Sequence, residues 1–222
     1  MKIKQLINVI KHPSLWEGLG GLLAFLFLFT ACSESEDETI DEYSNWQVRN
    51  DNFVASLQDS LSRGGSQWMK LKSYTKDESA AGQPSDYIYV KVLEEGGSQQ
   101  APIFTDTVRI CYRGRLIPTE NYPEGKVFDQ TYSGTFRWET TGVSKSVASG
   151  FVVGFTTAML HMHPGDRWRV YIPYKLGYDS QSRTNVPAYS TLCFDIAMIE
   201  YWHPGEKVQN WSARSYSVIP SI

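Results

Sequence analysis

The stretch Gly150-Phe-Val-Val-Gly-Phe-Thr-Thr-Ala-Met-Leu160 organises this sequence. Phe155, Met159 and Met162 recur at positions i, i+4 and i+7, which is the spacing of one apolar stripe along a helix. The sequence His163-Pro-Gly-Asp166 then ends the helix, because proline lacks a backbone N–H donor and glycine tolerates left-handed dihedral angles. We therefore predict one short helix that follows a loop and carries a single buried face.

Alternating strands flank this helix on both sides. Residues 167–172 alternate apolar with polar or amphipathic side chains after the helix, and residues 108–116 do so before it. Residues 88–92 and 192–198 show the same period of two, and residues 127–129 begin a shorter strand. A single short helix among such strands predicts one sheet wrapped around one helix. The side chains expected to face water include Tyr89, Arg109, Cys111, Arg113, Arg115 and Cys193.

The bulk composition allows one packed domain with appendages. The chain has 222 residues, of which 41% are hydrophobic and 14% aromatic, so a sizeable core can form. The formal net charge is -3 and the sequence contains no basic stripe. A nucleic-acid partner is therefore not expected, because such binding needs a cluster of lysine and arginine.

The first 32 residues predict export rather than a part of the fold. Lysines precede an uncharged apolar run over residues 19–31, which is shorter than the ~20 residues that a membrane-spanning helix needs and fits a signal peptide. The run ends in Phe29-Thr-Ala-Cys32, which resembles the lipobox of bacterial lipoproteins, where the cysteine carries lipid. The alternative is an ordinary signal peptide cut near Ala31.

An acidic segment follows the expected lipidation site Cys32 directly. Residues 33–38 read Ser-Glu-Ser-Glu-Asp-Glu, a composition that cannot bury apolar surface and therefore predicts a solvated tether. The run also resembles the export signal that follows the lipidated cysteine in surface lipoproteins of Bacteroidetes-type bacteria. We thus expect an outer-membrane lipoprotein that faces either the periplasm or the cell surface.

A second, amphipathic helix is expected between Asp41 and Ser62. Its apolar residues Tyr43, Trp46, Phe53, Leu57 and Leu61 fall on one helical face. The sequence leaves open whether this helix packs on the main domain or acts as a spacer. The expected segments are the signal peptide with its lipobox cysteine (1–32), the tether with the helical extension (33–85), the main domain (86–202) and a tail (203–222).

Seven short motifs follow one another between residues 86 and 202. They are Tyr112-x-Gly114, Val127-Phe-Asp129, Phe151-Val-Val-Gly-Phe155, Gly165-Asp166, Ile172-Pro-x-x-Leu-Gly-Tyr178, Val186-Pro187 and Thr191-Leu-x-Phe-Asp195. In order and spacing they resemble the motifs of FKBP-type peptidyl-prolyl cis-trans isomerases. The resemblance implies an α+β fold, a twisted antiparallel sheet of five to six strands wrapped around one short helix. It also implies an enzyme that rotates X–Pro bonds in client proteins.

The resemblance also assigns a proline pocket, residue by residue. Phe155 would be the floor under the prolyl ring, the Val152 N–H and the Tyr178 hydroxyl would donate to carbonyls beside the proline, and Asp129 would lie beside the rotating amide. Proline-containing peptide segments are the implied partners, binding of FK506-like macrolides is implied with them, and no cofactor or metal is needed. The expected catalytic residues are Tyr112, Asp129, Val152 and Tyr178, and the expected substrate-binding residues are Phe128, Phe136, Phe151, Phe155, Val186 and Phe194.

An aromatic pocket suits this chemistry for a physical reason. Rotation about the peptide bond faces a barrier of ~18–20 kcal/mol because the amide is conjugated. Water stabilises the charge-separated planar amide, so a dry aromatic pocket favours the less polar twisted form. Fixed donors that hold the flanking backbone leave the twist as the main remaining freedom.

Some residues depart from the family pattern. The arginine that usually pairs with the pocket aspartate is missing from the segment after Asp129, and Arg137 is the substitute that the sequence offers. The loop before Phe151 is longer by several residues. A peptide-binding module with weak catalysis is therefore a rival interpretation, and a structural lipoprotein that uses the fold as a spacer is a third.

Two cysteines remain beyond the lipobox. Cys111 and Cys193 are expected on neighbouring strands in an oxidising compartment, as two free thiols or as a cross-strand disulfide. His161 and His163 lie at the end of the predicted helix, where their rings point to different faces. This spacing does not favour a metal site.

Overall fold

The computed structural model describes residues 41–97, 100–139 and 142–211. The expected signal peptide, the lipidation site Cys32 and most of the expected tail lie outside the described residues. No helix within the described part of the chain is long and apolar enough to cross a membrane. The elements are α1 (Trp46–Arg63), η1 (Gly65–Gln67), β1 (Trp68–Lys72), η2 (Pro84–Asp86), β2 (Tyr87–Glu94), β3 (Thr107–Arg115), β4 (Val127–Gln130), β5 (Ser144–Val147), η3 (Ala148–Gly150), α2 (Val153–Met159), β6 (Arg167–Ile172), η4 (Tyr174–Leu176) and β7 (Leu192–Trp202).

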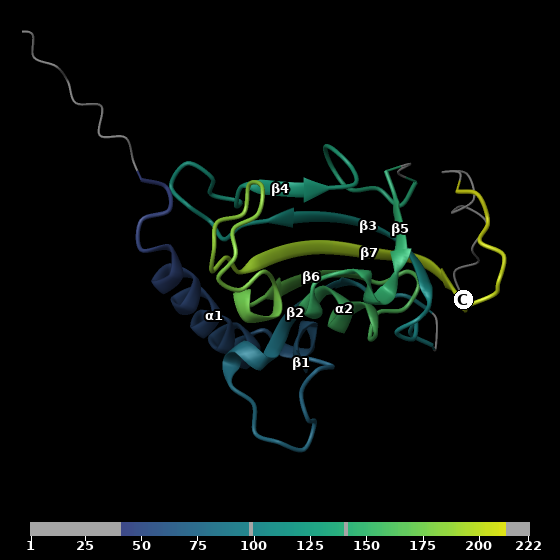
Figure 1. The fold of residues 1–222 in the computed structure, drawn as a ribbon, viewed down its shortest axis with the longest axis horizontal. Helices are drawn as coiled ribbons and strands as arrows, with labels where there is room; N and C mark the ends of the chain where they lie inside the picture. The colour runs from purple at the N-terminus through teal and green to yellow at the C-terminus, as the bar shows by residue number, and fades with distance from the viewer. Residues whose placement is uncertain (1–40, 98–99, 140–141, 212–222) are drawn as a thin grey trace, which may run out of the picture. The chain divides into compact units, whose positions relative to one another are not determined.

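Seven strands of the described residues form one antiparallel sheet. The order is β1-β2-β6-β7-β3-β4, and β5 pairs with β3 off this path. Figure 1 shows the long strands β7 and β3 at the middle of the sheet with α2 beside it. The predicted α+β fold is confirmed. The sheet exceeds the expected five to six strands because β1, from the segment assigned to the extension, pairs with β2 from Trp68↔Lys91 to Lys72↔Tyr87.

The helix α2 packs directly on one face of the sheet. Phe155 and Met159 on α2, and Met162 just beyond its end, are at most 2% exposed, so the predicted apolar stripe is buried. The helix itself ends at Met159, earlier than the predicted stop at 163–166. Gly154 permits the close approach, because a Cβ atom at this position would lie 2.3 Å from Cγ2 of Ile172 on β6. A larger residue there would push the helix away from the strand.

The N-terminal helix α1 covers part of the opposite face. Val54 and Leu57 pack against Tyr89 on β2, and the Gln58 side chain donates a 2.6 Å hydrogen bond to the Tyr89 hydroxyl. The sequence left open whether this helix packs on the main domain or acts as a spacer, and the structure shows that it packs on the sheet. The expectation that Tyr89 faces water is wrong, because α1 buries it completely.

A second small core covers the rest of that face. The segment after β4 folds back so that Tyr132 packs on Cys111, Ala197 and Ile199. Cys111 is therefore fully buried, although strand alternation places it on the side expected to face water. Burial raises the pKa of its thiol to about 12, so this cysteine stays protonated.

Arg109 is the other residue of β3 whose expected exposure is wrong. It is only 4% exposed, it pairs with Glu200, and its guanidinium lies 4.7 Å from the ring centroid of Trp202 and 5.5 Å from that of Trp211. An ion pair and two aromatic rings compensate for the burial of the charge.

The two cysteines are unpaired. The register between β3 and β7 sets Cys111 opposite Ala197 and Cys193 opposite Arg115. The two thiols are thus on neighbouring strands but not at opposed positions. A cross-strand disulfide, one of the two alternatives from the sequence, does not form.

Candidate active site

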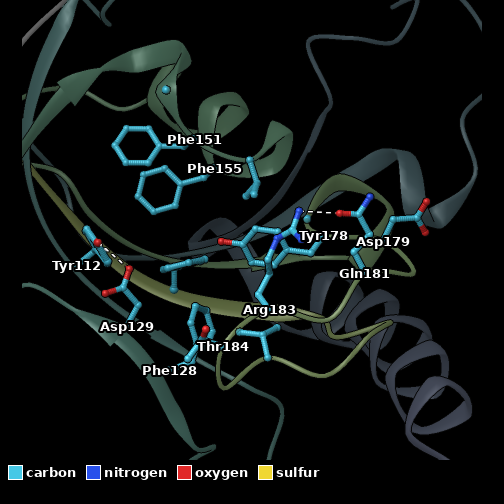
Figure 2. Close-up of a pocket in the computed structure, with 15 residues that line it drawn as sticks. Tyr112, Phe128, Asp129, Phe151, Phe155, Tyr178, Asp179, Gln181, Arg183 and Thr184 are labelled. Atoms are coloured by element: carbon cyan, nitrogen blue, oxygen red, sulfur yellow. Dashed lines mark hydrogen bonds between the residues drawn. The ribbon is translucent and has the colours of Figure 1, made fainter.

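An open cavity of about 850 Å³ lies between α2, the strands β3, β4 and β7, and the loop that precedes β7. This volume falls in the range of about 300–1,000 Å³ that is usual for ligand pockets. Nine of the ten residues expected in the catalytic and substrate-binding sets line it, as Figure 2 shows for most of them. The lining consists of Tyr112, Phe128, Asp129, Gly150, Phe151, Val152, Phe155, Gly177, Tyr178, Asp179, Gln181, Arg183, Thr184, Val186 and Phe194.

Phe155 is the centre of an aromatic cluster at the base of the cavity. Its ring stacks on Phe151 at 4.5 Å between centroids and meets Phe194 edge-on at 5.0 Å and Tyr112 at 5.8 Å. Phe128 extends the cluster through an edge contact with Phe194 at 5.4 Å. Since Phe155 lies in the first turn of α2, and this helix packs tightly on the sheet, the whole cluster has a fixed position.

Gly114 on β3 makes room for two of these rings. A Cβ atom at this position would lie 2.6 Å from Cζ of Phe128 and 2.6 Å from Cε1 of Phe194. Real Cβ atoms are not found at such distances from ring carbons, so a side chain there would displace the rings. The glycine in the Tyr112-x-Gly114 motif is thereby explained by packing.

A polar pair lies at the edge of the aromatic cluster. The Tyr112 hydroxyl donates a 2.8 Å hydrogen bond to Oδ2 of Asp129, and Figure 2 shows the pair on the side of the cavity opposite the loop after Tyr178. Burial, together with the neighbouring carboxylate, raises the pKa of Tyr112 above the ordinary tyrosine value. Tyr112 therefore remains a neutral donor throughout the physiological range.

Two further hydrogen-bond donors belong to residues that line the cavity. Val152 precedes α2 as its N-cap, and its N–H has no acceptor among the hydrogen bonds of the described residues. The Tyr178 hydroxyl also has no hydrogen-bond partner within the described ranges, and in Figure 2 it points toward Tyr112 and Asp129. A peptide in the cavity would meet both donors.

Phe136 is the expected pocket residue that the structure places elsewhere. Its ring packs on Tyr132 at 5.6 Å and on Trp138 at 5.2 Å, in the core on the other face of the sheet. The segment after Asp129 is short, so the chain crosses to that face before it reaches residue 136. The assignment by order along the family pattern is therefore wrong for this residue.

The expected substitution of Arg137 for the missing arginine is not observed. Arg137 is exposed, and none of the ion pairs of the described residues includes Asp129. The partner of the Asp129 carboxylate is instead the Tyr112 hydroxyl. A neutral donor replaces the guanidinium at this place.

The loop after Tyr178 contributes polar residues that the sequence reasoning missed. Arg183 lies with its guanidinium 5.4 Å from the Tyr178 ring centroid and donates a 2.6 Å hydrogen bond to Gln181. Backbone hydrogen bonds of 2.8 and 3.0 Å join Arg183 and Val186 across a tight turn. The one available signal was position, since the loop connects two expected pocket residues. The missed lining residues are Gly150, Gly177, Asp179, Gln181, Arg183 and Thr184.

The arrangement can hold a peptide without forming a covalent bond to it. An apolar ring fits on Phe155, and amide oxygens can accept from the Val152 N–H and the Tyr178 hydroxyl. Within residues 41–97, 100–139 and 142–211, no group of three or more His, Cys, Asp or Glu residues is placed to hold a metal ion. The Asp129 carboxylate lies beside Tyr112 in the cavity lining.

Comparison with known proteins supports the family that the motifs predict. Residues 98–199 match the model of the FKBP-type peptidyl-prolyl cis-trans isomerase family. These residues include β3, α2 and most of β7, and hence most of the cavity lining. The family model and the relatives thus support the resemblance to FKBP-type isomerases for this part of the chain.

Two relatives and one solved structure show how far the likeness extends. The macrophage infectivity potentiator of Trypanosoma cruzi is 29% identical over 173 residues, which are 78% of this chain and 77% of that protein. The isomerase FkpA of Escherichia coli K12 is 28% identical over 130 residues, 58% of this chain but only 43% of FkpA. A peptidyl-prolyl isomerase structure from Pseudomonas syringae has a TM-score of 0.51 at 20% identity, and the match covers 72% of this chain and 96% of that one. This last likeness concerns the fold alone.

Proposed function

On the premise that residues 98–199 form a domain of the FKBP-type peptidyl-prolyl cis-trans isomerase family, we propose that the chain catalyses rotation of X–Pro bonds in exported proteins. The observation that carries the proposal is the cavity in which Phe155 is surrounded by aromatic rings. The residues Val152 and Tyr178 line the same cavity, and the Val152 N–H and the Tyr178 hydroxyl are donors that have no partner within the described part of the chain.

In this proposal the prolyl ring lies on Phe155. Phe151, Tyr112 and Phe194 enclose it, so the X–Pro amide leaves water when the peptide binds. The planar amide carries more charge separation than the twisted one, and loss of water therefore raises the free energy of the planar form more. The barrier of ~18–20 kcal/mol falls because its starting state is stabilised less.

The donors at the rim restrict the peptide to one motion. The Val152 N–H and the Tyr178 hydroxyl hold carbonyl oxygens on either side of the rotating bond, so that the twist is the main freedom left. Asp129, oriented by Tyr112, faces the amide as it turns. No covalent intermediate forms and no proton needs to leave the substrate.

The proposed location rests on the sequence before residue 41. The apolar run that ends at Cys32 and the acidic run behind it support export, lipid attachment and anchoring to the outer membrane. The clients would then be envelope or secreted proteins. The compact unit Ile40–Ile222 begins shortly after this segment.

A peptide-binding module with weak catalysis is the second candidate function. It is favoured by the loop after Tyr178, which adds Asp179, Gln181 and Arg183 to the cavity. Polar rim residues suit prolonged holding of a peptide more than rapid turnover. The absence of an arginine partner for Asp129 among the described ion pairs also favours a binding module.

A protease-coupled isomerisation assay on short X–Pro peptides tests the proposal. The chain from Ser33 onward would be measured with several residues X before the proline. We expect acceleration over the uncatalysed rate for at least the apolar X residues. If no peptide isomerises faster than without protein, the enzyme proposal fails; tight peptide binding in the same samples would then select the binding module.

The location is tested separately by Cys32→Ala in cells. We expect the wild-type chain in the membrane fraction, extractable by detergent but not by high salt, and the variant in soluble form. Membrane retention of the variant equal to that of the wild type would contradict lipid anchoring through Cys32. A mature wild-type chain without added lipid mass would do the same.

A further inference from the structure

The helix α1 contacts the loop that forms one wall of the candidate active site. The indole Nε1 of Trp46 donates a 2.8 Å hydrogen bond to Oγ of Ser190, which in turn donates a 2.7 Å hydrogen bond to the Pro187 carbonyl. Trp46 is 6% exposed and Ser190 is 3% exposed. This contact spans 144 positions along the sequence.

Asn50, one turn further along α1, holds the same loop at a second point. Its Oδ1 accepts a 2.7 Å hydrogen bond from the Thr191 N–H, and its Nδ2 donates a 2.8 Å bond to the Trp46 carbonyl. Both Asn50 and Thr191 are completely buried. A polar side chain with no access to water is retained in this way only where both of its ends have partners.

The loop of residues 179–191, which α1 contacts at Ser190 and Thr191, has a strained backbone conformation. Asn185 and Tyr189 have φ angles of 62° and 61°, in the left-handed region. Tyrosine is rarely found there, since its Cβ atom approaches the following carbonyl oxygen. The Tyr189 ring packs on Tyr174 at 5.5 Å, and its N–H bonds to the Asp179 carbonyl at 2.8 Å. Such a loop persists when its surroundings hold it at several points.

Ser190 and Thr191, the two loop residues that α1 contacts, lie in the sequence between Val186 and Phe194, which line the cavity. Val186 precedes Ser190 and is 3% exposed, and Phe194 follows Thr191 as the third residue of β7. Figure 1 shows α1 alongside the end of the sheet where this loop enters β7. A shift of Ser190 and Thr191 is therefore transmitted to the cavity wall over a few residues.

We propose that α1 is a positioning element of the candidate active site, in which Trp46 and Asn50 hold the wall at Val186 in the geometry that binds the proline-containing peptide. The inference rests on the proposed function and adds to it a region outside the segment 98–199. Neither residue is among those that line the cavity. Their effect on the reaction would thus act through the loop, and chiefly on peptide affinity.

The test compares variants of one helix in the full chain. Asn50→Ala and Trp46→Phe each remove one hydrogen bond to the loop, and Trp46→Phe keeps a ring in place should the first variant fail to fold. Gln58→Ala is the matched control, because it removes a helix-to-sheet bond to Tyr89 without touching the loop. The measurements are KM and kcat on an X–Pro peptide, the thermal midpoint, and hydrogen exchange over residues 179–191.

We expect Asn50→Ala and Trp46→Phe to raise KM by about fivefold or more, as the loss of one buried hydrogen bond implies, with a smaller change in kcat. Exchange over residues 179–191 should become faster in both. Gln58→Ala should leave KM and the hydrogen exchange over residues 179–191 unchanged, even if it lowers the thermal midpoint as much as the other two variants do. Equal KM in all four proteins, or an equal rise in the control, overturns the inference.

The two levels of the proposal fail differently. An inactive wild-type chain sinks the proposed function, and the exchange measurement still decides whether α1 holds the wall. If the wild-type chain is active but Asn50→Ala and Trp46→Phe do not change the hydrogen exchange over residues 179–191, the proposed isomerase function stands. The proposed role of α1 is then refuted.

Discussion

The hydroxyl of Tyr112 on β3 donates a 2.8 Å hydrogen bond to the carboxylate of Asp129 on β4. In the resemblance that the motifs carry, the pocket aspartate has an arginine partner, and none of the described ion pairs supplies one. A neutral donor orients the carboxylate without neutralising it. Among the described residues, no cation therefore forms an ion pair with the Asp129 carboxylate at the rim of the cavity.

Tyr112→Phe should lower kcat/KM on X–Pro peptides by about tenfold or more, because a hydrogen bond to a charged group contributes ~1.5–3 kcal/mol. Because the pKa of Tyr112 is raised by burial and by Asp129, ionisation of this hydroxyl should not affect the rate below pH ~10. Tyr132→Phe, in the core on the other face of the sheet, is the control. A rate that is equal in wild type and Tyr112→Phe would contradict a role for the pair.

Phe155→Leu tests the floor of the pocket. The variant loses edge or stacking contacts with three rings, each worth ~0.5–1.5 kcal/mol, and we expect kcat/KM to fall by roughly tenfold or more. Met159→Leu, on the same buried face of α2, changes packing by less than ~1.5 kcal/mol and should leave kcat/KM unchanged. The rates and the thermal midpoints of both variants decide the matter. Similar losses of activity in the two would show that only packing is at stake.

Gly114→Ala should displace the rings of Phe128 and Phe194, whose carbons lie 2.6 Å from the position of the added methyl group. We expect a loss of ~1–3 kcal/mol in the free energy of unfolding, as overpacking usually costs. Phe128→Leu added to Gly114→Ala should recover part of that stability, since it removes one of the two clashes. Denaturant unfolding of the single and double variants measures this. Additive losses would argue against the clash.

Arg183 should influence which peptides bind. Its guanidinium is exposed at the rim over the Tyr178 ring and can meet an acidic side chain next to the proline. An exposed ion pair is worth ~0.2–1 kcal/mol, so Arg183→Gln should reduce the preference for acidic over neutral peptides by about two- to fivefold. The ratio of kcat/KM for the two peptides, measured at low and at high salt, is the test. A ratio that neither the variant nor salt changes would refute the prediction.

His203 should make stability depend on pH near neutrality. Its Nδ1–H donates a 2.8 Å hydrogen bond to the buried carboxylate of Asp106, and this bond, with Asp106 and Glu206 as negative neighbours, raises the pKa of His203. A raised folded-state pKa gives stability that is fully present below the ordinary value of about 6.5 and is lost as pH rises through the folded pKa. His203→Gln should thus lower the thermal midpoint at pH 5 more than at pH 9. An NMR titration of the ring at or below 6.5 would contradict the assignment.

The buried face of the central helix could be predicted, although the helix ends at Met159 and Met162 lies just beyond it. Phe155 and Met159 are buried together because helical periodicity depends only on residues close in sequence. The same is true of alternation in β6, where Trp168, Val170 and Ile172 are buried. The aromatic lining followed from motif resemblance, and it placed nine of ten residues in one cavity. Their catalytic roles stay predictions.

Local patterns failed where a distant segment covers a face. Tyr89 and Cys111 occupy positions that alternation assigns to water, yet both are fully buried. A period of two reports which residues share a face, not whether another part of the chain will pack on it. The same limit applies to Phe136, whose place depends on where the chain crosses the sheet.

The sequence by itself determined the short helix, the alternating strands around it and the aromatic set of the pocket, because periodicity and motif order are properties of neighbouring residues. The tertiary structure alone decided that α1 covers the far face of the sheet, that Tyr112 is the partner of Asp129, and that Asn50 holds Thr191. These contacts join residues far apart in the chain. They depend on shape and hydrogen-bond geometry between elements, for which a single sequence contains no local signal.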